Sequence, residues 1–377
     1  MIRKVYRKYM AHLKYKSQNI RVRKQKIGEW IEIFSMSFKL PIKNTPLSKE
    51  QKKEIDDYWT KEYGHKISKF WHRKYFAYSG KFDVKFFPEI LYTTKLEPLM
   101  NDDYVSSVLS DKSLVEIIFG NVLKTGQGVV VPKTICGCCR GFGYDGDRQP
   151  ASVKSLIEIV KGLEGSYIIK PSVGESSGHG VRLLQLEKGL DVRGKEKAEE
   201  ILRRYGTDFI IQERIKQHEE YAALHPDSIN TIRICTYRME DQIKTMPAIM
   251  RIGVGESFLD NAHAGGIYVG ISDEGILQKY ALSYHYKKLE YHPDSQIRFE
   301  GYQVPYMKKM LKSAKILHQC VPQIGFIHWD FSLNDKEEIV LIESNMCVGS
   351  IWLFQQAWGK GVFGEDTEYM INRIRKK

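Results

Sequence analysis

Three polar side chains lie in two otherwise apolar stretches near the C-terminal end of the sequence. Asp330 lies in IHWDF, and Glu343 and Asn345 lie in VLIESN. Residues two apart on a strand point to the same face, and a tight turn between the two stretches would bring Asp330 beside the other two. Carboxylates and carboxamides suit Mg²⁺, which commonly takes one or two carboxylates plus nucleotide phosphates. Exposed acids at strand ends are the alternative, but the apolar flanks favour a metal site.

The stretch SYIIKPSVGESSGHGV has the composition of a phosphate-binding loop. Lys170 ends a short apolar strand, and a loop rich in glycine and serine follows it. Glycines let backbone N–H groups approach phosphate oxygens closely, and the lysine adds a positive charge. A solvated hairpin loop is the alternative. The candidate phosphate contacts are Lys170, Ser172, Gly174, Ser176, Ser177, Gly178 and Gly180.

Four more residues are candidates for contact with substrate or phosphate. Arg233 lies in the middle of INTIRICTYR, where an unpaired cation is unfavourable, so its partner is either a phosphate or a buried carboxylate. Asn261 and His263 in DNAHAGG, and His179 in the glycine-rich loop, are flanked by glycines. These three residues either touch a substrate or serve only as turn residues.

The charge of the chain is concentrated at its beginning. The 377 residues carry a net charge of +12, yet residues 1–28 hold ten Lys and Arg and no acid, which leaves about +2 (12 − 10) for the rest. This distribution argues against a nucleic-acid-binding body. No apolar run reaches the length of a membrane span. Six cysteines in a chain of this length favour a reducing, cytoplasmic compartment, with Cys136, Cys138 and Cys139 expected in a loop.

The basic N-terminal segment has the pattern of an amphipathic helix. In residues 2–14 apolar side chains recur at helical spacing, with lysines and arginines between them. Such a helix can lie on an anionic membrane surface, and residues 1–26 are the candidate contact. The alternative is a helix that packs its apolar side on the parent domain.

The remaining periodicities predict an α+β fold with mainly antiparallel sheets, because sequential hairpins alternate with outer helices. Ser48 and Gln51 form a capping box that starts one helix. The predicted helices span 48–62, 114–123, 152–162, 195–205 and 306–320. The predicted strands span 129–131, 167–169, 181–184, 208–215, 229–238, 243–252, 266–271, 276–282, 326–333 and 339–344.

The order of these motifs resembles that of ATP-grasp proteins. The ordered set is Asp111-Lys112, Ile169-Lys170-Pro171 with its loop, Ile211 to Ile215, Asn230 to Arg233, His328-Trp329-Asp330 and Glu343-Ser344-Asn345. The segments SINTIR and HWDF, with the aromatic lead-in HRKYF…FFPEI, are most similar to the sugar-transfer-associated ATP-grasp proteins of polysaccharide biosynthesis. The resemblance covers roughly residues 70–360.

The resemblance implies a role for each matching residue. Lys112 and Lys170 would contact the phosphates of ATP, and residues 172–180 would close over them. Residues 212–215 would be the hinge that reads adenine, through Gln212, Glu213 and Ile215, with Glu219 or Glu220 near the ribose. Gln212 departs from the acidic residue that many ATP-grasp enzymes have there. Arg233 and Lys170 would stabilise the transferred phosphoryl group, and Asp330, Glu343 and Asn345 would hold Mg²⁺.

The resemblance also implies an organisation and an activity. We expect a basic extension and linker (1–47), a helical and aromatic region (48–135), a small subdomain with the phosphate loop and hinge (136–215) and a large subdomain with the metal site (216–377). The nucleotide would bind between the two subdomains. The expected activity is an Mg²⁺·ATP-dependent ligase that joins a sugar-acid or amino-acid carboxylate to an amine or thiol through an acylphosphate, in surface or capsular polysaccharide biosynthesis. The alternatives are a phosphotransferase acting on a hydroxyl and a non-catalytic membrane-associated scaffold.

Overall fold

The computed structural model describes residues 20, 22–24, 26–28, 30–31, 33–35, 40–125, 128–174, 178–284, 287–347 and 349–375. The helix predicted at 2–14 lies outside these residues. The chain divides into two compact units. Unit 1 comprises residues 1–106, 323–326 and 346–377, and unit 2 comprises residues 107–322 and 327–345. The two units are groups of residues that contact one another more than they contact the rest of the chain. The division into four segments made from the sequence stays a prediction.

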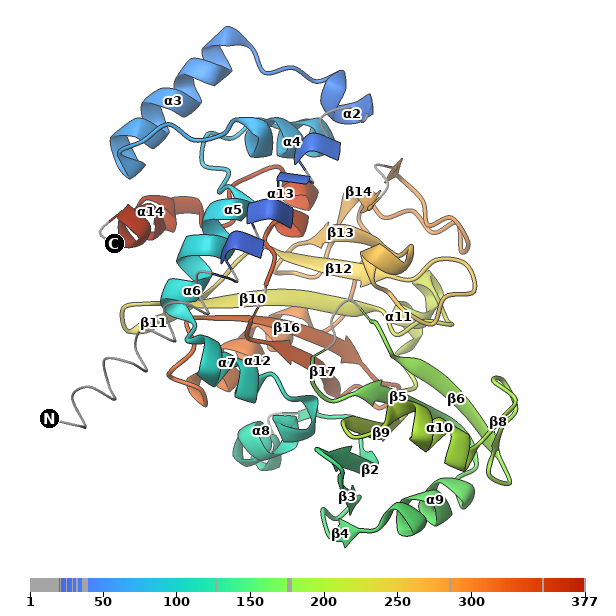
Figure 1. The fold of residues 1–377 in the computed structure, drawn as a ribbon. Helices are drawn as coiled ribbons and strands as arrows, with labels where there is room; N and C mark the ends of the chain where they lie inside the picture. Colours follow the sequence, from blue (N-terminus) through green and yellow to red (C-terminus); the bar gives the residue numbers. More distant parts are fainter. Residues whose placement is uncertain are drawn as a thin grey trace, which may run out of the picture. The chain divides into compact units, whose positions relative to one another are not determined.

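Helices make up most of the described part of unit 1 (Figure 1). They are α2 (Leu40–Lys43), α3 (Lys49–Tyr63), α4 (Phe70–Ser79), α5 (Glu89–Leu91), η1 (Tyr92–Leu96), α6 (Glu97–Met100), α13 (Trp352–Trp358), η4 (Gly364–Asp366) and α14 (Thr367–Arg375), with α7 (Asp103–Leu109) crossing the unit boundary. The aromatic residues predicted to pack do so, since Trp71, Tyr75 and Phe86 form a buried cluster.

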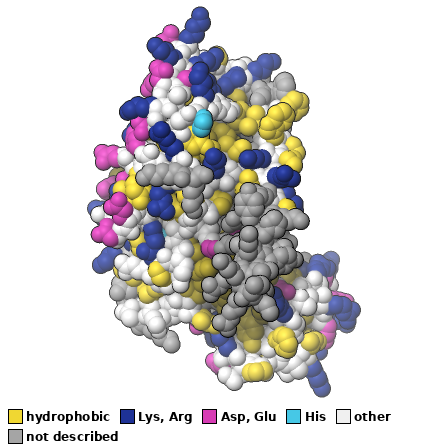
Figure 2. All heavy atoms as spheres, turned by 60° about the vertical axis from the view of Figure 1, so that its left-hand side comes forward, with side chains coloured by type: hydrophobic (Ala, Val, Ile, Leu, Met, Phe, Trp, Pro, Cys, Tyr) yellow, Lys and Arg dark blue, Asp and Glu magenta, His cyan; other side chains and the backbone are white. Residues whose placement is uncertain are grey.

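Helix α3 begins as the sequence predicts. Ser48 Oγ accepts a hydrogen bond from the Gln51 backbone N–H, and the Gln51 side chain accepts one from Ser48, which completes the capping box. The helix buries Ile55, Trp59 and Tyr63 and leaves its lysines in solvent. Lys and Arg side chains accordingly crowd the top of Figure 2, the height at which α3 lies in Figure 1.

The side chain of Asn101 ties together three remote parts of unit 1. Its Nδ2 donates to the carbonyls of Phe326 (2.8 Å) and Met346 (2.7 Å). Its Oδ1 accepts from the backbone N–H groups of Gly325 (2.9 Å) and Phe326 (2.8 Å). Phe326 is the first residue of strand β16, and Met346 directly follows strand β17. One buried carboxamide therefore fixes the start and the exit of this pair of strands.

Unit 2 contains a nine-stranded sheet in the order β1-β17-β16-β10-β12-β13-β14-β15, with β11 also paired to β10. All described pairings are antiparallel except that of β1 with β17. Helix α12 (Met307–Gln319) contacts β10 and β11 of this sheet, and helix α8 (Val115–Lys124) contacts α12. The strands are β1 (Val129–Val130), β10 (Thr231–Met239), β11 (Gln242–Thr245), β12 (Ala248–Ile252), β13 (Ile267–Ile271), β14 (Leu277–Ser283), β15 (Lys288–Leu289), β16 (Phe326–Leu333) and β17 (Ile339–Asn345).

The second sheet of unit 2 has eight antiparallel strands in the order β4-β3-β2-β9-β5-β6-β7-β8. Helices α9 (Val153–Lys161) and α10 (Ala198–Tyr205) pack on it over a core that includes Leu156, Ile169 and Leu184. The strands are β2 (Thr134–Cys139), β3 (Phe142–Asp145), β4 (Pro150–Ala151), β5 (Gly165–Pro171), β6 (Arg182–Glu187), β7 (Leu190–Asp191), β8 (Glu196–Lys197) and β9 (Phe209–Glu213). Short elements elsewhere in unit 2 are η2 (Lys112–Leu114), α11 (Glu219–Leu224) and η3 (Ala262–Ala264).

Two local predictions were wrong. The strand predicted over 243–252 is divided into β11 and β12, which pair with opposite ends of β10. The break falls at Pro247, which has no backbone N–H to donate to a ladder. The cysteines predicted in a loop lie on β2, and Cys136 and Cys138 belong to the core under α9 and α10.

The predicted fold class is confirmed, because the described chain is α+β with mainly antiparallel sheets. Within the described part of the chain, no helix is both long enough and apolar enough to cross a membrane.

Replacement of Asn101 by alanine should destabilise the protein. It would remove all four hydrogen bonds between this side chain and buried backbone groups. The Gly325 N–H would keep its bond to the Met100 carbonyl, and each group that loses its last partner would cost about 1–3 kcal/mol. Urea unfolding of Asn101→Ala and of the exposed Asn121→Ala would measure this difference. Equal unfolding midpoints for the two variants would contradict the assigned role of Asn101.

Candidate active site

The β16–β17 hairpin places the predicted metal ligands together. Asp330 pairs directly with Glu343 across the two strands, and His328 pairs with Asn345. Directly opposed residues share one face of a sheet. The Nδ2 atom of Asn345 lies 3.5 Å from Asp330 Oδ2. The geometric part of the prediction is therefore confirmed, while the metal role of these three residues stays a prediction.

Asp330 is almost fully buried and faces two arginines. Arg233 on β10 donates to both of its oxygens, from Nε to Oδ1 and from Nη2 to Oδ2, each at 2.7 Å. Arg251 on β12 places Nη2 at 3.3 Å from Oδ2. Burial alone would raise the pKa of Asp330, but the two guanidinium charges outweigh it and hold the pKa below its usual value. Of the two partners foreseen for Arg233, the structure contains the buried carboxylate.

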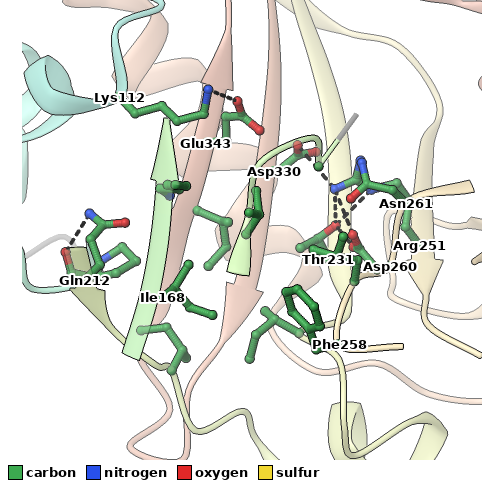
Figure 3. Close-up of a pocket in the computed structure, with 18 of the residues that line it drawn as sticks. Lys112, Ile168, Gln212, Thr231, Arg251, Phe258, Asp260, Asn261, Asp330 and Glu343 are labelled. Atoms are coloured by element: carbon green, nitrogen blue, oxygen red, sulfur yellow. Dashed lines mark hydrogen bonds and ion pairs between the residues drawn. The ribbon is translucent and has the colours of Figure 1, made fainter. Parts of the chain in front are cut away.

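Arg251 anchors a second polar cluster beside the first. Its Nη2 lies 3.3 Å from Asp260 Oδ1, and its Nε and Nη2 donate to Thr231 Oγ1 at 3.0 and 2.9 Å. The Thr231 hydroxyl donates to the other oxygen of Asp260. Burial raises the pKa of Asp260, although Arg251 acts in the opposite direction. Figure 3 shows this cluster and Asp330 on the same side of the cavity.

Two lysines lie near Glu343. Lys112 Nζ is 3.1 Å from Glu343 Oε1, and the Lys112 backbone N–H donates to the Ser172 carbonyl just after β5. Lys170 at the end of β5 is buried, and no hydrogen bond or ion pair to it occurs among the described residues. Burial lowers the pKa of Lys170 to about 8, with Glu343 acting against this shift and Lys112 adding to it.

These groups line one cavity of unit 2, together with apolar side chains (Figure 3). Its charged walls are Lys112, Lys170, Arg251, Glu213, Asp260, Asp330 and Glu343. With Arg233, which backs Asp330, there are four cations and four carboxylates, so the charges balance in the fully ionised state. The other walls are apolar and include Ile168, Ile229, Phe258 and Ile342. The two lysines, Lys112 and Lys170, and the apolar wall suit a molecule with an anionic part and a flat apolar part.

The predicted adenine hinge also lines the cavity. Gln212, Glu213 and Ile215 are all among its walls. The Gln212 side-chain amide donates to the Pro132 carbonyl and to Thr134 Oγ1, both at 3.2 Å, so this amide is already engaged. The Glu213 backbone N–H donates to the Lys133 carbonyl. Among the described residues no partner occurs for the Ile215 backbone N–H, which leaves it as a donor for a ligand.

The phosphate loop approaches the cavity closely at Gly178. This residue has φ +79°, and a Cβ there would lie 3.0 Å from Leu259 Cδ1 and 3.1 Å from Asn261 Oδ1. Glycine is therefore required both by the backbone conformation and by the close contact. Of the predicted substrate residues, His179 and Asn261 line the same cavity as Gly178.

Other predicted site residues lie away from the cavity walls. His263 is exposed and packs on the ring of Tyr284, with centroids 4.6 Å apart. Ser172 is buried and Glu219 is exposed at the start of α11. The remaining predicted residues that are not among the walls are Gly174, Gly180, Arg233 and Asn345. Ser176 and Ser177 lie outside the described residues.

The sequence analysis missed Arg251, Asp260, Thr231 and Phe258. The sequence feature that singled out Arg233 also applies to Arg251, because Arg251 is the one charged residue in the apolar strand AIMRI. The register of β10 with β12 pairs Thr231 with Arg251, and that pairing is not readable from periodicity. Asp260 and Phe258 lie in a loop, where nothing in the sequence sets them apart.

Comparison with known proteins identifies the family. The family model described as sugar-transfer associated ATP-grasp matches residues 91–370, well over half of the chain. The chain belongs to this family. The resemblance read from the motif order is therefore confirmed, as is the ATP-grasp fold. No curated protein sequence matches the chain.

Several solved structures of ATP-grasp ligases resemble the chain at low identity. The D-Ala:D-Ser ligase VanG from Enterococcus faecalis is 15% identical, with 73% of this chain and 63% of that one covered and a TM-score of 0.42. D-Alanine-D-alanine ligase from Helicobacter pylori is 14% identical, with 74% and 61% covered and a TM-score of 0.40. The chain spans less than two thirds of the length of both proteins.

The ATP-grasp assignment confirms ATP with Mg²⁺ as the cofactor, and the site fits both. Lys170 is a buried cation without a partner among the described residues, which a phosphate would supply. In the described part of the chain, no group of three or more His, Cys, Asp and Glu side chains is placed to hold a metal ion by itself. Two adjacent carboxylates and a carboxamide match an Mg²⁺ ion that takes its other ligands from phosphate and water.

ATP binding should take up a proton and weaken with rising pH because of Lys170. Its pKa of about 8 in the free protein should rise when a polyphosphate binds. The protonated form is then favoured in the complex, so affinity falls as the pH rises through about 8. Calorimetric titrations with Mg²⁺·ATP below and above this pH, in two buffers of different ionisation enthalpy, would measure both effects. Lys170→Arg, whose charge does not titrate here, should lose the dependence, and a pH-independent wild type would contradict it.

Proposed function

We propose that the protein is an Mg²⁺·ATP-dependent ligase that activates a carboxylate as an acylphosphate and passes it to an amine or thiol. The observation that carries this proposal is the cavity in unit 2. It combines Lys112, Lys170 and Arg251 with the paired carboxylates Asp330 and Glu343, next to an apolar wall. The family assignment supports the nucleotide part of the proposal.

The proposed reaction has two steps. An oxygen of the substrate carboxylate attacks the γ-phosphorus of ATP, which breaks the bond to the β-phosphate oxygen and gives an acylphosphate and ADP. The amine then attacks the acyl carbon, loses a proton and expels inorganic phosphate, leaving an amide. Such phosphoryl transfer depends on positioning and on neutralising charge.

The position of each residue in the cavity suggests its role in this reaction. Lys112 and Lys170 would bind the phosphates, and the apolar wall with the free Ile215 N–H would hold the base. Arg251 lies beside Asp330 and next to Thr231 and Asp260, so it would receive the negative charge of the transferred phosphoryl group. Arg233 would keep Asp330 ionised through its two hydrogen bonds. Arg233 could bind a phosphate only if Asp330 gave up these hydrogen bonds to coordinate the metal ion. Bound Mg²⁺ would neutralise phosphate charge, held by Asp330, Glu343 and Asn345.

The substrate and the cellular setting are further parts of this proposal. The family description links these proteins to sugar transfer, which supports a sugar acid or an amino acid joined during surface-polysaccharide assembly. The basic residues 1–26 support contact with the anionic cytoplasmic face of a membrane. Both ideas stay predictions.

Trapping with hydroxylamine tests carboxylate activation without knowledge of the natural amine. A ligase given Mg²⁺·ATP, sugar acids or amino acids, and hydroxylamine should form hydroxamate together with equal amounts of ADP and inorganic phosphate. A phosphotransferase acting on a hydroxyl would release ADP without phosphate and leave a stable phosphoester. A well-folded wild type that binds no Mg²⁺·ATP would overturn the ligase and the phosphotransferase together and favour the scaffold.

Glu343→Gln should abolish most Mg²⁺-dependent turnover while the protein stays folded. The Glu343 side chain is 29% exposed, and Lys112 is its one ion-pair partner among the described residues, so loss of its charge should cost little stability. The exposed Glu187→Gln on β6 is a matched control. Asp330→Asn is a weaker test because it removes the carboxylate between two buried arginines, a change that costs about 3–5 kcal/mol in comparable sites. Wild-type turnover by Glu343→Gln, measured as ADP release, would remove Glu343 from the metal site.

Lys170→Ala should weaken ATP binding strongly, since the variant lacks the buried cation nearest the phosphate loop. Lys154→Ala is the matched control, because Lys154 is exposed on α9. Calorimetry with Mg²⁺·ATP should show at least a tenfold loss of affinity, or about 1.4 kcal/mol, in the first variant alone. Equal affinity in both variants would place the phosphates elsewhere.

A further inference from the structure

The described helical residues between 20 and 35 expose a set of large apolar side chains. Ile20, Ile27, Trp30, Ile31 and Phe34 have exposed fractions of 52, 61, 75, 64 and 65%. By contrast, none of the large apolar side chains of α3 and α4, all of them described residues, is exposed, and Trp59, Trp71 and Tyr75 are fully buried. A segment that exposes this much apolar surface needs an explanation beyond ordinary surface composition.

These side chains form one face rather than a scatter. Their spacings of seven, three or four, and three residues recur at the helical period, so at 100° per residue they fall within an arc of roughly 100°. We call this set, Ile20, Ile27, Trp30, Ile31 and Phe34, the apolar face. An arc of this width is what a surface helix normally buries against a partner.

The surroundings of the apolar face are basic. Arg23, Lys24 and Lys26 belong to the same described helical residues and are exposed. The sequence from residue 1 to residue 34 contains ten Lys and Arg and two acids, Glu29 and Glu32, which gives a net charge of +8 (10 − 2). A partner for this segment must therefore offer both an apolar phase and negative charge. A second copy of the chain offers the apolar face but repels the basic residues, since each copy brings the same ten cations.

We propose that the apolar face docks on an anionic phospholipid bilayer, with the helix lying in the plane of the interface. Apolar side chains would enter the boundary between headgroups and acyl chains, and Trp30 would sit at the depth that indole rings prefer. The basic residues would contact anionic headgroups, which add attraction for each charge near the surface. This inference deepens the membrane contact proposed for residues 1–26 by naming the face and the lipid charge, and it does not depend on the ligase chemistry.

Vesicle sedimentation with the full-length protein tests the proposal. The wild type should sediment with vesicles of phosphatidylcholine and phosphatidylglycerol, less with pure phosphatidylcholine, and less when salt is added. The double variant Ile27→Asp, Ile31→Asp should lose on the order of tenfold or more of this binding, because two carboxylates would have to enter the interface. Both side chains are already exposed, so the fold should tolerate the change. Phe142→Asp is the matched control, since Phe142 is 80% exposed but lies on β3 of unit 2.

Each alternative has its own outcome. Equal vesicle binding by the wild type and the double variant would overturn the proposal. So would equal binding to neutral and anionic vesicles, because the partner would then not be selected by charge. Failure to bind vesicles, with a dimer seen by light scattering that the double variant abolishes, would assign the face to a second copy. Release of ADP from soluble substrates should be the same in wild type and double variant, so failure of the ligase proposal would be visible separately.

Discussion

The site depends on one buried charge arrangement, the Asp330 carboxylate between Arg233 and Arg251. A carboxylate and two guanidinium groups are costly to bury singly, and they are tolerated here because each satisfies the others. The arrangement needs three strands in one register. β16 carries Asp330, β10 carries Arg233 beside it, and β12 adds Arg251 from the other side of β10. The order β17-β16-β10-β12 is therefore a requirement of the charges as well as of the hydrophobic core.

The same arrangement gives the cavity its polarity. Arg233 covers both oxygens of Asp330, so the carboxylate is ionised and oriented before any ligand arrives. The Glu343 carboxylate contacts the ammonium group of Lys112. Lys170 is left as the cation without such a hydrogen-bonded partner among the described residues, and it lies at the end of β5 where the glycine-rich loop begins. Preorganised charge of this kind stabilises a polyphosphate without reorganising the protein.

Sequence reasoning predicted the parts of this structure that depend on local pattern. The capping box of α3, the helix after Ser152 and the pairing of Asp330 with Glu343 all follow from spacing and residue type. Sequence reasoning failed where the structure depends on pairing between strands that are far apart in the sequence. The split at Pro247 and the position of the cysteines on β2 depend on which strands lie beside them. Arg251 shows the limit most clearly, because its strand was predicted while its partners Thr231 and Asp260 come from other elements.

The hydrogen bonds of Asn101 also bear on the order in which the chain can fold. Its partners lie 224 to 245 residues further along the chain, and Tyr58 on α3 donates to Glu368, 310 residues later. During synthesis the amino-terminal helices therefore leave the ribosome long before the residues that complete their unit exist. In unit 2 the nine-stranded sheet waits almost as long, since β1 pairs with β17, but the eight-stranded sheet spans only residues 134–213. The nascent protein should thus assemble that sheet with α9 and α10 first, while the aromatic surfaces of unit 1 wait for the end of translation.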